Sequence, residues 1–291
     1  MTRVLLTGAG GFVGSALQKK LGAHSDFEVY STRSAPPRRI TLDLETPGSA
    51  AALVQEVKPH FILHPAAWTS IAVCEKDPAR ARRINTEAPL EMAEAAARIH
   101  ARFLFFSTDQ VFDGEAAPYT EASPVHPLHA YGRTKAEAEA GLLAMEGCAI
   151  LRLALVYGNS PTGTRSASEM VTGAARQGKT LTLFTDEVRT PIPVDFVARA
   201  ALALCKADFT GVLNLGGRDR LSRHAFGLLV CKAYGLNPAF IRPGKAADLT
   251  LTPPRPRDLT LTSDRLSEVL GISPSTVEKE LASLSGPSSP D

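Results

Sequence analysis

A glycine-rich turn near the start of the chain constrains the fold more than any other feature. Residues 3–7 form a short apolar run, and the turn that follows places glycines at Gly8, Gly11 and Gly14. Residues 15–21 then show helical spacing. Glycines between a strand and a helix let the backbone approach a pyrophosphate, which then sits at the helix N-terminus. The turn therefore predicts a dinucleotide site; a capping loop without function is the less favoured interpretation.

The composition narrows the class of protein. The chain has 291 residues, 44% of them hydrophobic, which suffices for one large or two modest domains. A net charge of +2 without long charge runs argues against nucleic acid or a membrane surface as partner. No apolar run approaches the ~18 residues of a membrane span, and no signal peptide precedes the first strand. We therefore expect a cytoplasmic protein.

The remaining pattern predicts an α/β fold. Apolar strands alternate with helices, as in a Rossmann-type, doubly wound parallel sheet. After the first strand, the expected strands cover residues 27–30, 40–44, 61–64, 102–106, 149–157 and 212–215. A long helix over residues 79–100 is interrupted near Asn85. The four cysteines are scattered singly in mostly apolar surroundings, so we expect reduced core residues and neither disulfides nor a metal site.

The end of the second strand bears on the cofactor. An NAD site usually has an acidic residue here for the ribose hydroxyls, but this strand runs into Ser31, Thr32 and Arg33. An arginine suits a 2′-phosphate, so NADP(H) is favoured and NAD(H) stays open. Asp43 could accept from the adenine amine, and it is equally well explained as a turn aspartate. His64 is better explained by packing at a strand end than by catalysis.

A tyrosine and a lysine four residues apart supply the chemistry. Tyr131 and Lys135 open a helical segment and lie on one face of it. An ammonium beside a phenol lowers the phenol pKa, which would make Tyr131 a general acid near neutral pH. Thr108 follows the apolar strand over residues 102–106, at the edge where parallel strands place their ligands. Alone, each motif is also explained by an exposed tyrosine or by turn chemistry; their combination favours an active site.

The order and spacing of these motifs resemble the extended short-chain dehydrogenase/reductases. The residues that flank these motifs are similar to those of the dTDP-4-dehydrorhamnose reductase branch of that family. The resemblance covers essentially the whole chain. The matching segments are Phe-Ser-Thr-Asp-Gln-Val-Phe-Asp-Gly at 106–114, Pro-Tyr-Thr-Glu at 118–121, Tyr-Gly-Arg-Thr-Lys at 131–135, Ala-Ala-Trp-Thr at 66–69, Arg-Thr-Pro at 189–191, and Arg-Pro at 255–256. There are departures: Ile71 and Ala72 stand where the branch has Val-Asp, and His64-Pro65 is unusual.

The resemblance implies roles for particular residues. The implied catalytic residues are Thr108, Tyr131 and Lys135, of which the last two also contact the cofactor. The other implied cofactor-binding residues are Gly8, Gly11, Phe12, Val13, Gly14, Arg33, Asp43, Leu44, Ala66, Ala67 and Trp68. The implied substrate-binding residues are Thr69, Asp109, Val111, Phe112, Arg189 and Arg255. No metal site is carried over.

The resemblance also implies an activity and a domain organisation. A dinucleotide-binding domain would comprise residues 1–157 and about 193–219. A smaller C-terminal substrate domain would comprise about 158–192 and 220–291. The implied reaction is NADPH-dependent reduction of a 4-keto nucleotide-sugar, with Tyr131 as proton donor and Thr108 as a second donor to the same oxygen. A homodimer is compatible with the family.

Other functions remain to be weighed. Related 4,6-dehydratases carry a glutamate base where this chain has Gln110, a neutral amide, so dehydration is disfavoured. Epimerases retain NAD, which the expected NADP preference argues against. A non-catalytic regulator similar to the β subunit of methionine adenosyltransferase stays open, because that subunit resembles the same branch. A reductase for another activated sugar stays open too.

Overall fold

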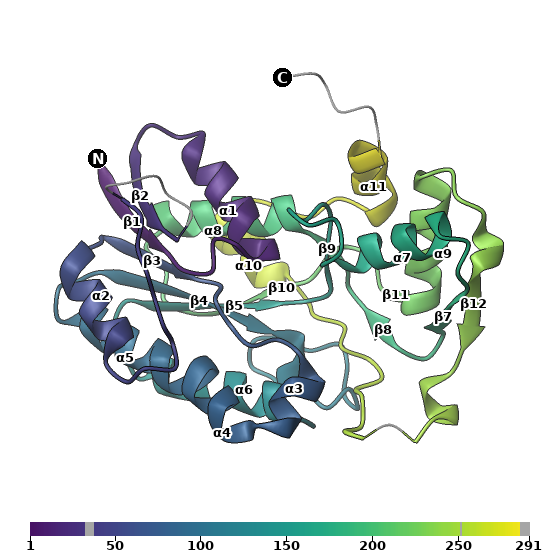
Figure 1. Cartoon of the computed structure of the whole chain (residues 1–291), viewed down its shortest axis with the longest axis horizontal. Coiled ribbons are helices and arrows are strands. Elements are labelled where there is room, and N and C mark those ends of the chain that lie inside the picture. Colours follow the sequence, from purple (N-terminus) through teal and green to yellow (C-terminus); the bar gives the residue numbers. More distant parts are fainter. Residues whose placement is uncertain (33–37, 251, 286–291) are drawn as a thin grey trace.

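A six-stranded parallel sheet forms the centre of the larger part of the molecule (Figure 1), with strand order β10-β5-β4-β3-β1-β2. The computed structural model describes residues 1–32, 38–250 and 252–285. The strands of this sheet are β1 (Thr2–Leu6), β2 (Phe27–Ser31), β3 (Phe61–His64), β4 (Arg102–Thr108), β5 (Cys148–Leu153) and β10 (Gly211–Leu215). The helices around it are α1 (Phe12–Gly22), α2 (Ser49–Val57), α3 (Ile71–Lys76), α4 (Pro78–Arg82), α5 (Ala88–Ala97), α6 (Ala130–Leu143), α8 (Val194–Lys206) and α10 (Asp264–Leu270).

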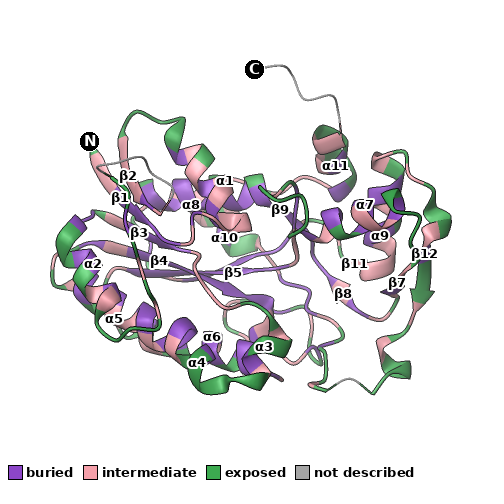
Figure 2. Ribbon diagram, viewed as in Figure 1, coloured by how far each residue is buried: buried purple, intermediate pink, exposed green. Residues whose placement is uncertain are grey.

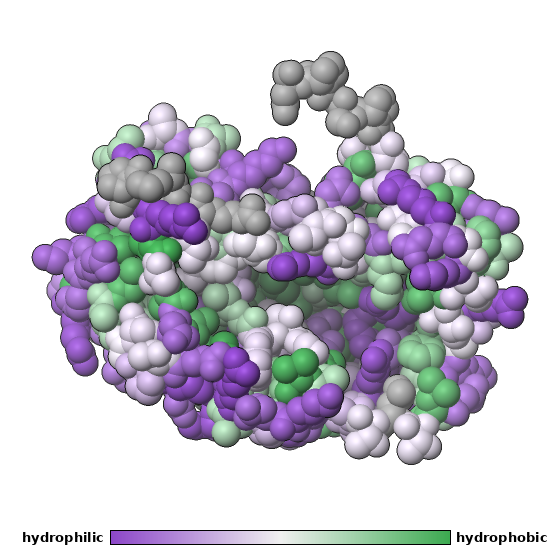
Figure 3. Space-filling model, viewed as in Figure 1, coloured by the Kyte–Doolittle hydropathy of each residue, from purple (hydrophilic) through white to green (hydrophobic). Residues whose placement is uncertain are grey.

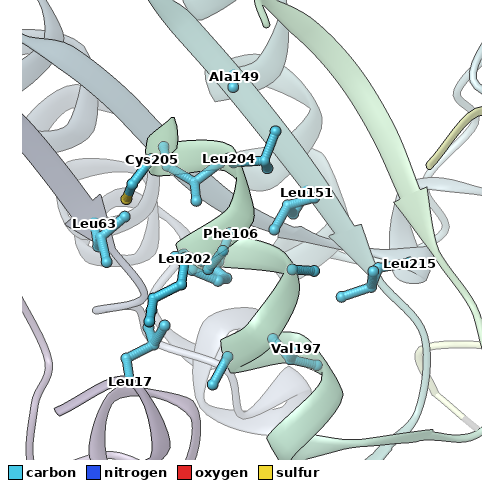
Figure 4. Close-up of a cluster of buried hydrophobic side chains, with 14 of the residues drawn as sticks. Leu17, Leu63, Phe106, Ala149, Leu151, Val197, Leu202, Leu204, Cys205 and Leu215 are labelled. Atoms are coloured by element: carbon cyan, nitrogen blue, oxygen red, sulfur yellow. The ribbon is translucent and has the colours of Figure 1, made fainter. Parts of the chain in front are cut away.

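Helices cover both faces of this sheet because its strands are apolar on both sides. On one face, α1 and α8 pack on side chains such as Leu63, Phe106 and Leu151 (Figure 4). On the other face, α2, α5 and α6 bury a second cluster that includes Phe103 and Phe105. Figure 2 shows the sheet as largely buried, with exposed residues on the outer faces of the helices. The predicted α/β, doubly wound parallel sheet is therefore confirmed.

Local boundaries differ from the predictions in three places. The interruption near Asn85 is a π-helical turn, η1 (Arg83–Glu87), between α4 and α5. The strand expected over 149–157 is divided into β5 and the two-residue β6 (Val156–Tyr157). The strand expected over 40–44 is wrong: these residues form no strand, and of the described residues just before them, Arg39 forms an isolated bridge with Ser31. The segment turns instead around Asp43, whose carboxylate accepts from the backbone of Glu45.

A smaller part beside the sheet has its own core of side chains that include Tyr157, Leu183, Phe226 and Ile241 (Figure 1). Its elements are short strands in pairs and three helices: β6 with β9 (Ile192–Pro193), β7 (Leu181–Phe184) with β12 (Ile241–Gly244), β8 (Val188–Arg189) with β11 (Leu221–Ser222), α7 (Ala167–Arg176), α9 (Arg223–Ala233) and α11 (Val277–Ser285). Short 3₁₀ turns are η2 (Asp109–Val111), η3 (Pro238–Phe240) and η4 (Ala246–Asp248). Within the segment expected for the smaller domain, α10 packs instead on the main sheet through Leu266. The division into two domains remains a prediction.

Candidate active site

The glycine turn is shaped so that only glycines fit two of its positions. Gly8 has a positive φ of 59°, and a Cβ there would lie 2.9 Å from the backbone of Ala66. A Cβ on Gly14 would lie 2.0 Å from the carbonyl oxygen of Gly8. Helix α1 begins after Gly11 without a side-chain cap, so its first N–H groups stay available to an anion. This cradle has room for a pyrophosphate, and its use as the cofactor site stays a prediction.

Two adjoining cavities extend from this turn and share Gly8, Gly11, Pro65 and Ala67. Together they are called the cofactor cleft below. The first has a volume of about 510 Å³. Its lining residues are Gly8, Gly11, Phe12, Val13, Gly14, Pro65, Ala67, Thr69, Ser107, Thr108, Tyr131, Leu153, Ala154, Val156 and Arg165. The second, of about 320 Å³, is further lined by Leu42, Asp43, Leu44, Glu45, Ala66, Trp68 and Ile84. The structure thus brings nearly all predicted cofactor-binding residues together; Arg33 lies outside the described residues.

The three predicted catalytic residues come from the end of β4 and the first turns of α6. Thr108 and Tyr131 both line the cofactor cleft. Lys135 follows one helical turn later and is 1% exposed. Its Nζ lies 3.6 Å from the centre of the Phe105 ring. Burial lowers the pKa of Lys135 to about 7.

The expected lowering of the Tyr131 pKa by Lys135 is not what the structure gives. Burial raises the pKa of Tyr131 above its ordinary value, and the Thr108 hydroxyl acts in the opposite direction by hydrogen bonding. The cost of a phenolate with little access to water exceeds the help of neighbouring donors. At neutral pH Tyr131 is therefore protonated, which is the form that a proton donor needs.

A third cavity, called the arginine cavity below, lies between the catalytic edge and the smaller part. Its volume is about 340 Å³. Its lining residues are Ile71, Gln110, Leu155, Met170, Leu181, Thr182, Leu183, Phe184, Glu187, Arg189, Arg223, Arg255 and Pro256. Three arginines and one glutamate give it an excess of positive charge. Figure 3 shows the surface hollowed near the centre of this face, between the two parts of the molecule.

Each arginine of this cavity has a different setting. Arg189 is buried, donates to the carbonyl oxygens of Pro256 and Arg257, and has Nε 3.9 Å from Asp109. Arg255 is half-exposed and lies 3.8 Å from Glu187. The guanidinium of Arg223 makes no hydrogen bond or ion pair with any residue that the structure describes. Burial lowers the pKa of Arg223 to about 10.

The other predicted substrate residues divide into two groups. Thr69 lines the cofactor cleft, and Asp109 is buried beside Arg189, where burial raises its carboxyl pKa. Val111 and Phe112 are fully buried, and Phe112 stacks on Tyr119 with ring centres 4.1 Å apart. These two side chains pack in the interior instead of facing a cavity. A direct substrate contact through them is therefore not supported by their positions.

His64 is a packing residue, as the sequence favoured. It is fully buried, its Nδ1 lies 2.9 Å from the hydroxyl of Thr7, and its ring stacks on Phe103 and Phe105. Burial lowers its pKa to about 3, so the imidazole is neutral. His64 thus supports the end of β1 that carries Gly8. Asp43 likewise has a local role in its turn, besides lining the cleft.

Sequence reasoning missed several residues at these cavities. Arg165 lies across the cofactor cleft and donates to the carbonyl oxygen of Gly10 at 3.5 Å. Ser107 lines the same cleft with a buried hydroxyl that has no partner among the described residues. One signal was present for Arg223: it is the first residue of α9, where the helix dipole disfavours a cation. Because a cation at this position destabilises the helix, its presence favours a role in binding.

Two further searches cover the described part of the chain. No group of three or more His, Cys, Asp and Glu side chains in residues 1–32, 38–250 and 252–285 could hold a metal ion. In the same residues, every helix is too short or too polar to cross a lipid bilayer.

Comparisons with known proteins agree with this geometry. The β subunit of methionine adenosyltransferase 2 from Xenopus laevis is 31% identical over 278 residues, 93% of this chain and 83% of that protein. The probable low-salt glycan biosynthesis reductase Agl14 from Haloferax volcanii is 30% identical over 287 residues, 96% of each. The crystal structure of a dTDP-4-dehydrorhamnose reductase from Clostridium acetobutylicum has a TM-score of 0.84 and 26% identity, covering 97% of this chain and 98% of that one. A dTDP-4-dehydrorhamnose reductase from Bacillus anthracis, in complex with NADP, has the same fold, with a TM-score of 0.86, 22% identity and coverage of 97% and 98%.

The family model described as the RmlD substrate binding domain matches residues 1–287. This match spans both the cofactor cleft and the arginine cavity. The chain therefore belongs to the RmlD substrate binding domain family.

Proposed function

We propose that the protein is an NADPH-dependent reductase of a 4-keto nucleotide-sugar, similar to dTDP-4-dehydrorhamnose reductase. One observation carries the proposal: Thr108 and Tyr131 line the same cleft as the glycine turn. A dinucleotide held at Gly8 and Gly14 would extend toward these two donors. The family match and the resemblance to dTDP-4-dehydrorhamnose reductases support the choice of reaction.

The chain's own residues would act on the carbonyl oxygen. When bound, the cofactor supplies the hydride. Tyr131 is protonated at neutral pH and donates its proton to the oxygen as negative charge develops there. Thr108 donates a hydrogen bond to the same oxygen. In its protonated form, Lys135 carries a positive charge one helical turn from Tyr131, and this charge stabilises the phenolate left after proton transfer.

The arginine cavity would hold the anionic part of the substrate. Arg189, Arg223 and Arg255 form donors that suit phosphate oxygens. The apolar strand β7 forms another wall of this cavity, where a nucleoside could pack. Under this proposal, the smaller part serves as the substrate domain, Thr69 contacts the substrate from the cofactor cleft, and Asp109 acts beside Arg189. We further propose a cytoplasmic location, in line with four free, buried cysteines.

Gln110 argues against dehydration. Its amide oxygen lies 3.1 Å from His129 Nε2, and its amide nitrogen donates to Asp109. A neutral amide engaged in this way cannot remove a proton from a sugar carbon. The reduction therefore fits this site better than a 4,6-dehydratase reaction does.

A second candidate is a regulatory subunit without turnover. The similarity to the β subunit of methionine adenosyltransferase 2 over 93% of the chain favours it specifically. Such a subunit would keep NADP binding at the glycine turn and would need a partner protein. Turnover separates the two candidates.

The test is NADPH oxidation, followed by absorbance, with a dTDP-4-keto-6-deoxyhexose and its 3,5-epimerase. Wild type and Tyr131→Phe are compared, with NADH as the alternative cofactor. We expect turnover by wild type with NADPH, and a loss of about 10²–10⁴-fold in Tyr131→Phe with cofactor binding retained. Turnover retained in the variant would remove Tyr131 from the mechanism. Cofactor binding without turnover on this or related keto-sugars would favour the regulatory subunit.

A further inference from the structure

The helix that carries Tyr131 begins with an unusual cap. His129 is the N-cap of α6, and its Nδ1 accepts a hydrogen bond of 3.1 Å from the backbone N–H of Gly132. Asparagine, aspartate, serine and threonine are the ordinary residues for this position. His129 is fully buried, and its ring lies nearly parallel to that of Tyr131, with centres 6.2 Å apart. The residue that caps the helix is thus also packed beside the proton donor.

The cap fixes the protonation of the ring. Because Nδ1 accepts from Gly132, the proton of the neutral imidazole must lie on Nε2. That nitrogen faces the amide oxygen of Gln110 at 3.1 Å and donates to it. The amide nitrogen of Gln110 then donates to Asp109 Oδ1 at 3.0 Å. Each hydrogen bond in this series has one allowed direction, with donation from Gly132 to His129, from His129 to Gln110, and from Gln110 to Asp109.

The far end of this series of hydrogen bonds reaches Thr108, the second hydrogen-bond donor of the site. Asp109 Oδ1 also accepts from the Thr108 hydroxyl at 3.3 Å, and the backbone N–H of Gln110 donates to Thr108 Oγ1 at 3.2 Å. The backbone supports the same contact, because a Cβ on Gly132 would lie 2.2 Å from the carbonyl oxygen of Gln110. Helix α6 therefore meets the end of β4 through a close backbone contact and a directed set of side-chain bonds.

We propose that His129 and Gln110 are positioning residues, which set the place of Tyr131 relative to Thr108 through the bonds Gly132–His129–Gln110–Asp109. This inference rests on the proposed reductase function. Gln110 is suited to this place because a single amide both accepts from His129 and donates to Asp109. A glutamate would set a second carboxylate against Asp109, and a methionine of similar length would make neither bond.

These hydrogen bonds require a neutral His129 ring. Burial lowers its pKa to about 4. The charged groups around the ring are Glu75 on α3, which opposes that shift, and Arg133 on α6 and Arg255 from the C-terminal segment, which add to it. A second proton would sit on Nδ1 and remove the acceptor for Gly132. The bonds therefore persist at neutral pH and fail only in acid.

The test compares Gln110→Glu, Gln110→Met and His129→Asn with His126→Asn, an exposed histidine in the same loop. We expect kcat to fall about 10–100-fold in the first three, with KM for NADPH within about twofold of wild type, because a misplaced donor slows the step without loosening the cofactor. His129→Asn keeps a capping side chain, so its melting temperature should stay close to wild type. Losses in the pair Gln110→Met and His129→Asn should not add, since both break one set of bonds. Wild-type kcat in Gln110→Glu and Gln110→Met would overturn the inference.

A readout independent of turnover uses the full chain with ¹⁵N-labelled histidine. The His129 ring nitrogens should report one proton, on Nε2, throughout the neutral range. In Gln110→Glu, a carboxylate facing Nε2 should raise the His129 pKa and shift both nitrogens. Ring nitrogens unchanged in that variant would mean that His129 does not bond to position 110, which overturns the inference. Absence of wild-type turnover would instead defeat the proposed function, so the two failures are distinguishable.

Discussion

The cofactor cleft is formed mainly by backbone, whereas the arginine cavity is formed mainly by side chains. The cleft takes its shape from backbone, at a glycine turn and at strand ends, and its key residues lie in short stretches of sequence. The arginine cavity takes its character from side chains on widely separated segments, and these side chains include Gln110, Arg189, Arg223 and Arg255. A backbone cradle tolerates almost no added volume, whereas a cavity lined by several separate side chains should lose affinity stepwise when one of them is changed. The following predictions test that contrast.

The largest effect is expected from adding one methyl group to the cleft. In Gly14→Ala, the new Cβ would lie 2.0 Å from the Gly8 carbonyl oxygen, so the turn must move. We expect the Kd for NADPH to rise about 100-fold or more, since the displaced N–H groups no longer converge on the pyrophosphate. Fluorescence titration measures this. Gly22→Ala at the other end of α1 is the control, because its Cβ meets nothing within 4 Å. Equal Kd values for the two variants would show that the turn is not the cofactor site.

The next largest effect is on the pH dependence of stability, and it comes from His64, which supports the end of β1 below the cofactor cleft. Because burial lowers the pKa of His64 to about 3, the unfolded chain binds a proton near pH 6.5 that the folded chain refuses. The stability due to neutral His64 is therefore present above that pH and lost as pH falls toward 3. By about pH 5 the loss is roughly 2 kcal/mol. Urea unfolding across this range should show a shallower pH dependence in His64→Asn than in wild type. The exposed His24→Asn should follow wild type; parallel curves for all three would contradict the assignment.

A smaller effect is expected from the unpaired cation of the arginine cavity. Arg223→Met should raise KM for the keto-sugar about tenfold, the worth of one partly screened charge on a phosphate. It should leave the Kd for NADPH unchanged. The same variant should melt at a higher temperature than wild type, because it removes an unpaired cation from a helix N-terminus. Arg242→Met, on the exposed strand β12, is the control. An unchanged KM would place the phosphates elsewhere.

The same contrast explains what the sequence could predict. The glycine turn, the Thr108 edge and the Tyr131 helix are each encoded within a few residues, and the parallel sheet then brings their ends together. Arg223 and Gln110 line the same cavity only because α9 and η2 lie on two sides of it. No local sequence pattern predicts this arrangement. Val111 and Phe112 show the opposite failure: they lie within a recognisable motif, yet both side chains are buried in the core. Neighbourhood in sequence predicted the segment correctly but not the direction of each side chain.

The wrong expectation for the Tyr131 pKa has a related cause. Spacing placed Lys135 on the same helical face, but it gave no measure of burial. In the folded chain the loss of water around the phenol raises its pKa more than the hydrogen bond from Thr108 lowers it, and the Lys135 ammonium lies over the Phe105 ring. Charges in a sequence can be counted, whereas their solvation depends on packing from the whole fold.

The smallest effect is expected from replacing the carboxylate of Asp109. This change should increase stability and decrease turnover. Burial raises the pKa of Asp109, with Arg189 opposing, so the ionised form costs stability as pH rises through that pKa. Asp109→Asn removes this cost and should raise the free energy of unfolding at neutral pH, with the gain disappearing below the ordinary pKa of an aspartate. Turnover should fall in the same variant, because the asparagine no longer offers a carboxylate to Gln110 and Arg189. Chemical unfolding at neutral and acid pH, beside steady-state kinetics, measures both. A variant less stable than wild type at neutral pH would mean that Arg189 compensates the buried charge of Asp109 in full, and this ion pair would then stabilise the edge of the arginine cavity.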